Sequence, residues 1–174
     1  LTEINNGSSP VIQVGFQKGP AVVADLNGDG LVDILNVDHG KEVEGTQIDG
    51  NWPGGVNHLI LSAFSNPNVS DVPIMTTEQR FWHDLDAGDV DNDGDLDIVM
   101  TSFDAIYLFT NNGSGEFSIQ ILDRFSDHGV VQFIDVDSDG FSEILTAPYI
   151  NGQQKQLKLF SSENGIWSGR TIGP

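Results

Sequence analysis

The stretch Asp89-Val-Asp-Asn-Asp-Gly-Asp-Leu-Asp97 decides the fold, because its design occurs three times in the chain. The other copies are Asp25-Leu-Asn-Gly-Asp-Gly-Leu-Val-Asp33 and Asp135-Val-Asp-Ser-Asp-Gly-Phe-Ser-Glu143. We call residues 25–33, 89–97 and 135–143 loop 1, loop 2 and loop 3. Each loop has an oxygen-bearing side chain at positions 1, 3, 5 and 9 and glycine at position 6.

This spacing is typical of a short loop that wraps a hard cation such as Ca²⁺. Alternate side chains point inward, the glycine allows a sharp bend, the carbonyl of position 7 adds a ligand and the last carboxylate closes the shell. The alternative is three solvated acidic turns, which the shared internal register disfavours. The sequence therefore predicts three calcium sites.

The composition sets limits on the class of protein. The chain has 174 residues, a formal net charge of -19 and no cysteine, and the three loops hold twelve of its 26 acidic residues. Its size allows one compact domain with a core. The charge argues against nucleic acid or an anionic membrane as a partner, since both require basic patches. No apolar stretch approaches the roughly 20 residues of a membrane-spanning helix, so membrane insertion is not expected.

The segments that flank the loops predict β-strands. Short runs rich in β-branched residues, such as Ala21-Val-Val-Ala24 and Ile34-Leu-Asn-Val37, lie before and after loop 1, and no long helical stripe follows any loop. Each loop should therefore join two antiparallel strands. In the second repeat, the Asn-Gly turn between Ala105–Thr110 and Phe117–Leu122 predicts a further hairpin. Four strands per repeat predict an all-β fold of β-propeller blades.

The three loops, the apolar pair after each loop and the hairpin Phe109-Thr-Asn-Asn-Gly-Ser-Gly-Glu-Phe117 resemble the FG-GAP/VCBS repeat of integrin-like β-propellers. The resemblance implies that the loops lie on one face of the propeller and bind Ca²⁺. It assigns as ligands Asp25, Asn27, Asp29, Leu31 and Asp33 in loop 1, Asp89, Asp91, Asp93, Asp95 and Asp97 in loop 2, and Asp135, Asp137, Asp139, Phe141 and Glu143 in loop 3. Because Asn27 replaces an acid, the first site should be weaker than the second.

The number of repeats is low for a closed propeller, which usually has four to eight blades. We expect blades at about residues 18–81, 82–127 and 128–174, and a partial blade at about 1–17, where Ile4-Asn-Asn-Gly-Ser resembles the hairpin turn of the second repeat. Three interpretations remain open. The chain could be a piece of a longer protein, several copies could assemble, or it could stand alone with atypical ends.

A ligand surface is expected at the end of the blades opposite the metal loops. The first repeat carries a long insertion there, about residues 38–57, and long loops on a rigid scaffold often carry function. The candidate ligand-binding residues are Trp52, Trp82, His83 and His128, because an indole can stack on a sugar ring. Packing between blades is the alternative for the tryptophans. His39 and His58 are expected in loops.

These features predict an extracellular or cell-surface module, stabilised by three Ca²⁺ ions, that recognises a glycan or a protein surface. The alternatives are a structural subunit that assembles with further copies through open blade ends, and a fragment of a polysaccharide-degrading enzyme. Catalysis is the less favoured reading, because nothing fixes the mutual geometry of His83, His128, Lys41 and Arg80. A calcium-dependent oligomer, glycan binding or release of a cleaved polysaccharide would discriminate among the three.

Overall fold

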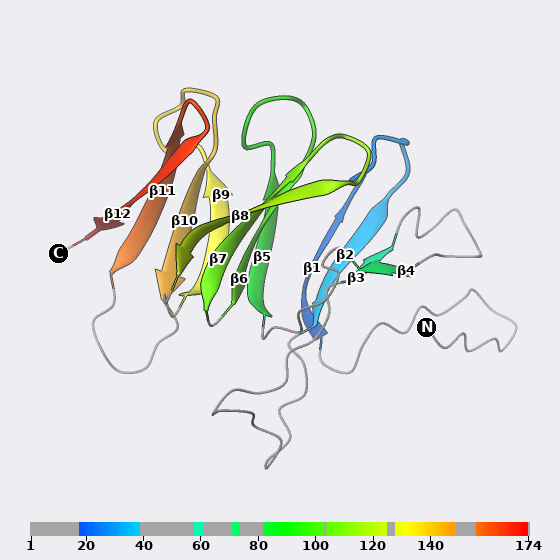
Figure 1. Cartoon of the computed structure of the whole chain (residues 1–174), viewed down its shortest axis with the longest axis horizontal. Helices are drawn as coiled ribbons and strands as arrows, with labels where there is room; N and C mark the ends of the chain where they lie inside the picture. The colour runs from blue at the N-terminus through cyan, green and yellow to red at the C-terminus, as the bar shows by residue number, and fades with distance from the viewer. Residues whose placement is uncertain are drawn as a thin grey trace, which may run out of the picture.

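The fold is all-β in the residues that the structure, a computed structural model, describes. These are 18–38, 58–60, 71–73, 82–102, 104–124, 128–148 and 156–173, with side chains at 21–36, 82–102, 104–124, 129–147 and 156–173. They form twelve strands in three antiparallel four-stranded sheets, each a meander in chain order. The sheets stand side by side as blades of a partial β-propeller (Figure 1). The predicted fold class is therefore confirmed.

We name the sheets blade 1, blade 2 and blade 3. Blade 1 contains β1 (Lys18–Ala24), β2 (Asp33–Asp38), β3 (His58–Ile60) and β4 (Asp71–Pro73). Blade 2 contains β5 (Trp82–Gly88), β6 (Asp97–Ser102), β7 (Ala105–Asn111) and β8 (Phe117–Arg124). Blade 3 contains β9 (His128–Ile134), β10 (Glu143–Pro148), β11 (Leu157–Glu163) and β12 (Ile166–Ile172).

Loops 1, 2 and 3 join the first two strands of their blades, which are antiparallel as predicted. The expectation for His58 was wrong, because its backbone pairs with Asn36 and begins β3. The expected partial blade at 1–17 lies outside the described residues. So do His39, Trp52 and the insertion beyond β2.

The core consists of two apolar layers between the blades. Leu26 and Leu35 of blade 1 pack with Trp82, Tyr107 and Phe109 of blade 2. On the other face of blade 2, a second cluster contains Val90, Val99, Ile106, Leu108, Val131, Ile144 and Phe160. Because successive residues of a strand point to opposite faces, β6 and β7 supply both layers, and they are buried at nearly every position. The middle blade therefore holds its two neighbours together.

Polar contacts also join blade 2 to blade 3. The carboxylate of Asp84 accepts a hydrogen bond from the Val131 amide (3.0 Å), and that of Asp86 accepts one from the Phe133 amide (2.8 Å). These contacts run from β5 to β9, the first strands of neighbouring blades, and they satisfy amides at the edge of the blade 3 sheet. Blade packing is thus specified by hydrogen bonds as well as by apolar burial.

Candidate metal centres

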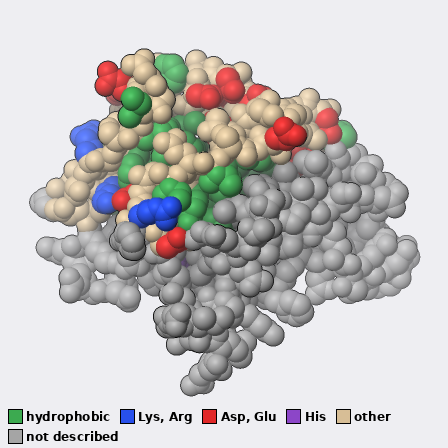
Figure 2. All heavy atoms as spheres, viewed as in Figure 1, with side chains coloured by type: hydrophobic (Ala, Val, Ile, Leu, Met, Phe, Trp, Pro, Cys, Tyr) green, Lys and Arg blue, Asp and Glu red, His purple; other side chains and the backbone are tan. Residues whose placement is uncertain are grey.

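The three loops share one backbone conformation at one end of the blades. In each loop, positions 4 and 6 have positive φ: 72° and 80° at Gly28 and Gly30, 60° and 97° at Asn92 and Gly94, and 64° and 92° at Ser138 and Gly140. Glycine at position 6 adopts this left-handed conformation at little cost. All three loops project from the same end of the molecule (Figure 1), and acidic side chains gather along that edge (Figure 2).

The carboxylate at position 1 is held by amides of its own loop. Its Oδ2 accepts a hydrogen bond from the glycine at position 6, over 2.7 Å at Asp25, 3.0 Å at Asp89 and 3.1 Å at Asp135. Further along, the position 5 carboxylates of Asp29, Asp93 and Asp139 accept from the amides of position 7, over 2.8 to 2.9 Å. Each loop therefore curls around its own side-chain oxygens.

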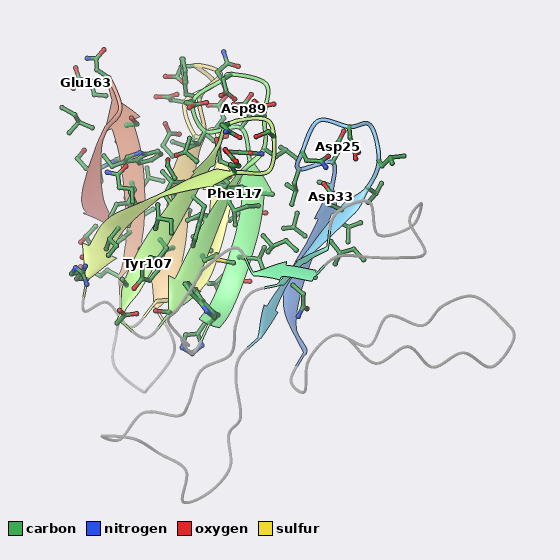
Figure 3. The ribbon with its side chains drawn as sticks, turned by 45° about the vertical axis from the view of Figure 1, so that its right-hand side comes forward. Asp25, Asp33, Asp89, Tyr107, Phe117 and Glu163 are labelled. Atoms are coloured by element: carbon green, nitrogen blue, oxygen red, sulfur yellow. The ribbon has the colours of Figure 1, made fainter. Side chains whose placement is uncertain are left out.

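The carboxylate at position 9 links the end of each loop to its beginning. Asp33, Asp97 and Glu143 accept a hydrogen bond from the amide of position 2 over 2.8, 2.8 and 3.0 Å. Their side chains are buried, with 0%, 0% and 7% exposure. A buried carboxylate is costly unless it is paired or coordinates a cation. Figure 3 places Asp25, Asp33 and Asp89 at this end of the blades.

In loops 2 and 3, the carboxylates of positions 1, 3 and 9 converge. Asp89, Asp91 and Asp97 have ligand oxygens that all lie within 4.8 Å of one another, and so do Asp135, Asp137 and Glu143. This oxygen-only donor set fits a hard cation such as calcium. These two clusters could hold a metal ion.

Loop 1 lacks a third carboxylate in this position because Asn27 occupies position 3. The Asn27 side chain turns toward its own loop, where its Oδ1 accepts from the Asp29 amide (3.1 Å) and its Nδ2 donates to Asp29 Oδ2 (3.3 Å). Asn27 therefore offers one neutral oxygen where loops 2 and 3 offer a carboxylate.

The side chain of Asp95 lies outside the carboxylate cluster of loop 2. A Cβ atom built on Gly113, in the turn between β7 and β8, would clash with Asp95 Oδ2. The Asp95 carboxylate thus faces that turn. Its backbone carbonyl is the atom that the loop pattern assigns to a metal, as for Leu31 and Phe141.

Burial, and after it the clustered charges of loop 2, raise the pKa of two of its carboxyl groups. Burial raises the pKa of the Asp97 carboxyl to about 6, against the hydrogen bonds from Val90 and Asn111 that lower it. The pKa of Asp91 is also raised, first by burial and then by the charge of Asp93. A cation bound at these carboxylates would favour their ionised forms and lower both pKa values.

The opposite end of the blades contains the other sequence-predicted residues. Trp82 is 1% exposed, and its ring packs edge-on against Tyr107 with centroids 5.3 Å apart. A side chain this buried offers no face to a sugar ring, so we leave Trp82 out of the ligand surface. His83 is half-buried, His128 begins β9 but its side chain is outside the described set, and Trp52 is not described.

Sequence reasoning missed a polar cluster at this end of blade 2. The Asp104 carboxylate accepts hydrogen bonds from the Tyr107 hydroxyl (2.9 Å) and from the Ser102 hydroxyl. Tyr107 lies toward the end of β7 away from loops 1 to 3 (Figure 3). No periodic motif marks this cluster, because it depends on the β6–β7 connection bringing three side chains together.

Comparison with known proteins identifies the repeat class. Residues 89–146 match the family model of the FG-GAP-like repeat. The match begins at position 1 of loop 2 and ends in β10, so it covers loops 2 and 3. This segment is therefore an FG-GAP-like repeat, and the resemblance drawn from the sequence is confirmed. No curated protein matches the chain. No helix in the described residues is long and apolar enough to cross a membrane.

Proposed function

We propose that the chain is an extracellular β-propeller module, stabilised by three Ca²⁺ ions, that recognises a glycan or a protein surface. The observation that carries the proposal is the loop that occurs three times with positive φ at positions 4 and 6 and with the amide of position 2 bonded to a buried carboxylate at position 9. Solvated turns have no reason to repeat a buried closing carboxylate in every copy.

The proposed calcium ligands are the side-chain oxygens of positions 1, 3, 5 and 9 and the carbonyl of position 7. Carboxylate and carbonyl oxygens suit Ca²⁺, and glycine at position 6 allows the bend. Loop-type sites in extracellular modules bind Ca²⁺ with dissociation constants of roughly 0.1 to 1 mM. Such sites fill outside the cell, where FG-GAP repeats are typically found. These points support an extracellular or cell-surface location.

In this proposal, calcium has a structural role. Each ion fixes the connection between the first two strands of a blade and neutralises carboxylates that repel one another. Recognition then falls to the opposite end, where half-buried His83 lies on blade 2. His128 and Trp52 remain candidates for the same surface. Glycan-array binding and pull-down of an extracellular protein test the two ligand classes.

Asp91→Ala and Asp137→Ala are each expected to remove one of three bound ions. Both substitutions delete the position 3 carboxylate from a converging cluster. Isothermal titration calorimetry and native mass spectrometry count the ions. Asp123→Ala is a matched control, because Asp123 pairs with Lys158 rather than with a loop. A wild-type stoichiometry of zero or one would overturn the calcium proposal.

A second candidate function is assembly with further copies, and the exposed apolar side chains on the face of blade 3 turned away from blade 2 favour it. One face of blade 3 packs on blade 2 through Val131, Ile144 and Phe160. The opposite face exposes Val130 (56%), Ile134 (36%) and Leu157 (40%). An uncovered apolar sheet face is a common site of protein contact. A blade from a second copy is the partner that we propose for this face.

If this face forms an interface, Val130→Asp should weaken self-association about tenfold or more, because the charge would be buried there without a partner. Sedimentation velocity over a range of protein concentrations, in saturating Ca²⁺, measures the effect. Ile119→Asp is the control, since Ile119 is similarly exposed (51%) on β8 of blade 2. A wild-type chain that stays monomeric at every concentration would rule out this candidate.

A further inference from the structure

The Asn111 side chain bridges two neighbouring metal loops. It is 4% exposed at the end of β7, and its Nδ2 donates to the carbonyl of Leu26 in loop 1 (2.8 Å) and to that of Leu96 in loop 2 (3.1 Å). Its backbone amide donates to Asp97 Oδ1 (2.9 Å), the closing carboxylate of loop 2. One residue therefore contacts both loops, and its hydrogen bond to Leu26 spans 85 positions of the sequence.

The turn that begins at Asn111 also packs closely against both loops. We call residues 111–116 the Asn111 turn, and Asn111 Oδ1 shapes it by accepting from the amides of Gly113 and Gly115, both over 3.2 Å. A Cβ on Gly28 of loop 1 would be 3.0 Å from the Gly113 carbonyl oxygen, and one on Gly113 would meet the Asp95 carboxylate of loop 2. The turn and the two loops therefore pack with no room for larger residues.

These contacts reach groups that the proposed sites use. Leu26 directly precedes the position 3 ligand Asn27, whose Cβ lies 3.3 Å from the Cβ position of Gly115. Asp97 is the position 9 ligand of loop 2. A cation that immobilises Asp97 would thus also immobilise Asn111. Through the Asn111 side chain it would immobilise the backbone of loop 1 next to Asn27, which replaces a carboxylate.

Within the described part of the chain, loop 3 has no equivalent bridge to loop 2. In blade 3 the corresponding hairpin is a two-residue turn, Asn164–Gly165, with φ of 53° and 78° and with Glu163 paired to Ile166. Among the described residues, this turn makes no hydrogen bond to loop 2. Loops 1 and 3 both neighbour loop 2, but the bridge joins loop 2 to loop 1 alone.

We propose that Asn111 is a positioning residue that couples the cation affinities of loops 1 and 2 and leaves loop 3 independent. The inference rests on the proposed calcium binding. A cation in loop 2 orders the Asn111 turn, so loop 1 binds its own cation with less ordering left to do. Coupling of this kind is reciprocal, so filling loop 1 must strengthen loop 2 by the same factor.

Site-resolved calcium titration tests the coupling. The amides of Gly30, Gly94 and Gly140 each donate to the position 1 carboxylate of their own loop, so their NMR resonances report the three loops separately. In Asp91→Ala, the dissociation constant of loop 1 for Ca²⁺ should rise about fivefold or more, and that of loop 3 should stay unchanged. Asp25→Ala should weaken loop 2 by a similar factor.

Asn111→Ala should abolish the coupling between loops 1 and 2. In the Asn111→Ala background, adding Asp91→Ala should therefore leave the dissociation constant of loop 1 for Ca²⁺ unchanged. Asn112→Ala is the matched control, because Asn112 bonds only within the turn and should leave the coupling intact. If Asp91→Ala changes the dissociation constants of loops 1 and 3 equally, or changes neither, the inference is wrong. This outcome is decisive even where Asn111→Ala does not fold. If wild-type protein shows no calcium-dependent shift at any of the three glycines, the proposed calcium binding itself fails.

Discussion

Removal of calcium is expected to lower the melting temperature of the chain by about 15–30 °C. An ion that binds only the folded state stabilises it by about 2.7 kcal/mol at a hundredfold excess over Kd. Three such sites contribute about 8 kcal/mol, and each kcal/mol corresponds to about 2–4 °C for a chain of this size. Differential scanning calorimetry with excess Ca²⁺ and then with excess EDTA measures the shift.

EDTA that is already saturated with Ca²⁺ is the control, because it leaves the ions in place and isolates any effect of the chelator itself. Restoring free Ca²⁺ should recover the original melting curve. A melting temperature that is unchanged by EDTA would mean that the loops are solvated turns. The three buried position 9 carboxylates would then have another role.

The sequence predicts the loops and the meander well because both depend on local spacing. Positions 1, 3, 5, 6 and 9 fix which atoms of loops 1 to 3 can meet, and they do so within nine residues of chain. The Asn-Gly turn likewise predicts the β7–β8 hairpin from adjacent residues. Such patterns determine a structure without reference to anything far along the chain.

Contacts between blades could not be predicted in the same way. The Asn111 bond to Leu26 spans 85 positions, and the bonds from Asp84 and Asp86 to β9 span 47. From the sequence, Asn111 is predicted only to be part of a turn. No pattern in the neighbouring residues predicts that this turn packs against the loop of the preceding blade. Trp82 shows the same limit, because a residue at a strand end can face either a ligand or a neighbouring sheet.

The stability of the protein should respond to acid in opposite directions with and without calcium. In EDTA, the raised pKa of Asp97, about 6 against 3.8 for an ordinary aspartate, means that the folded state binds this proton more tightly than the unfolded state. The stabilisation is therefore complete below about pH 4 and is lost as the pH rises through 6. Asp91, whose pKa is raised by burial and by Asp93 and Asp89, acts in the same direction.

Lowering the pH from 7.5 to 5 should therefore raise the free energy of unfolding in EDTA, by roughly 1 kcal/mol from Asp97 alone. In saturating Ca²⁺ the same change should lower it, because protons compete with the ion for the carboxylates of all three loops. The free energy of unfolding differs by about 8 kcal/mol between saturating Ca²⁺ and EDTA. This difference should decrease at pH 5, because one value falls and the other rises. Urea denaturation at each pH measures both curves. Parallel curves would contradict the assignment of Asp97 as a metal ligand, since a carboxylate that only accepts amide hydrogen bonds would titrate alike in both conditions.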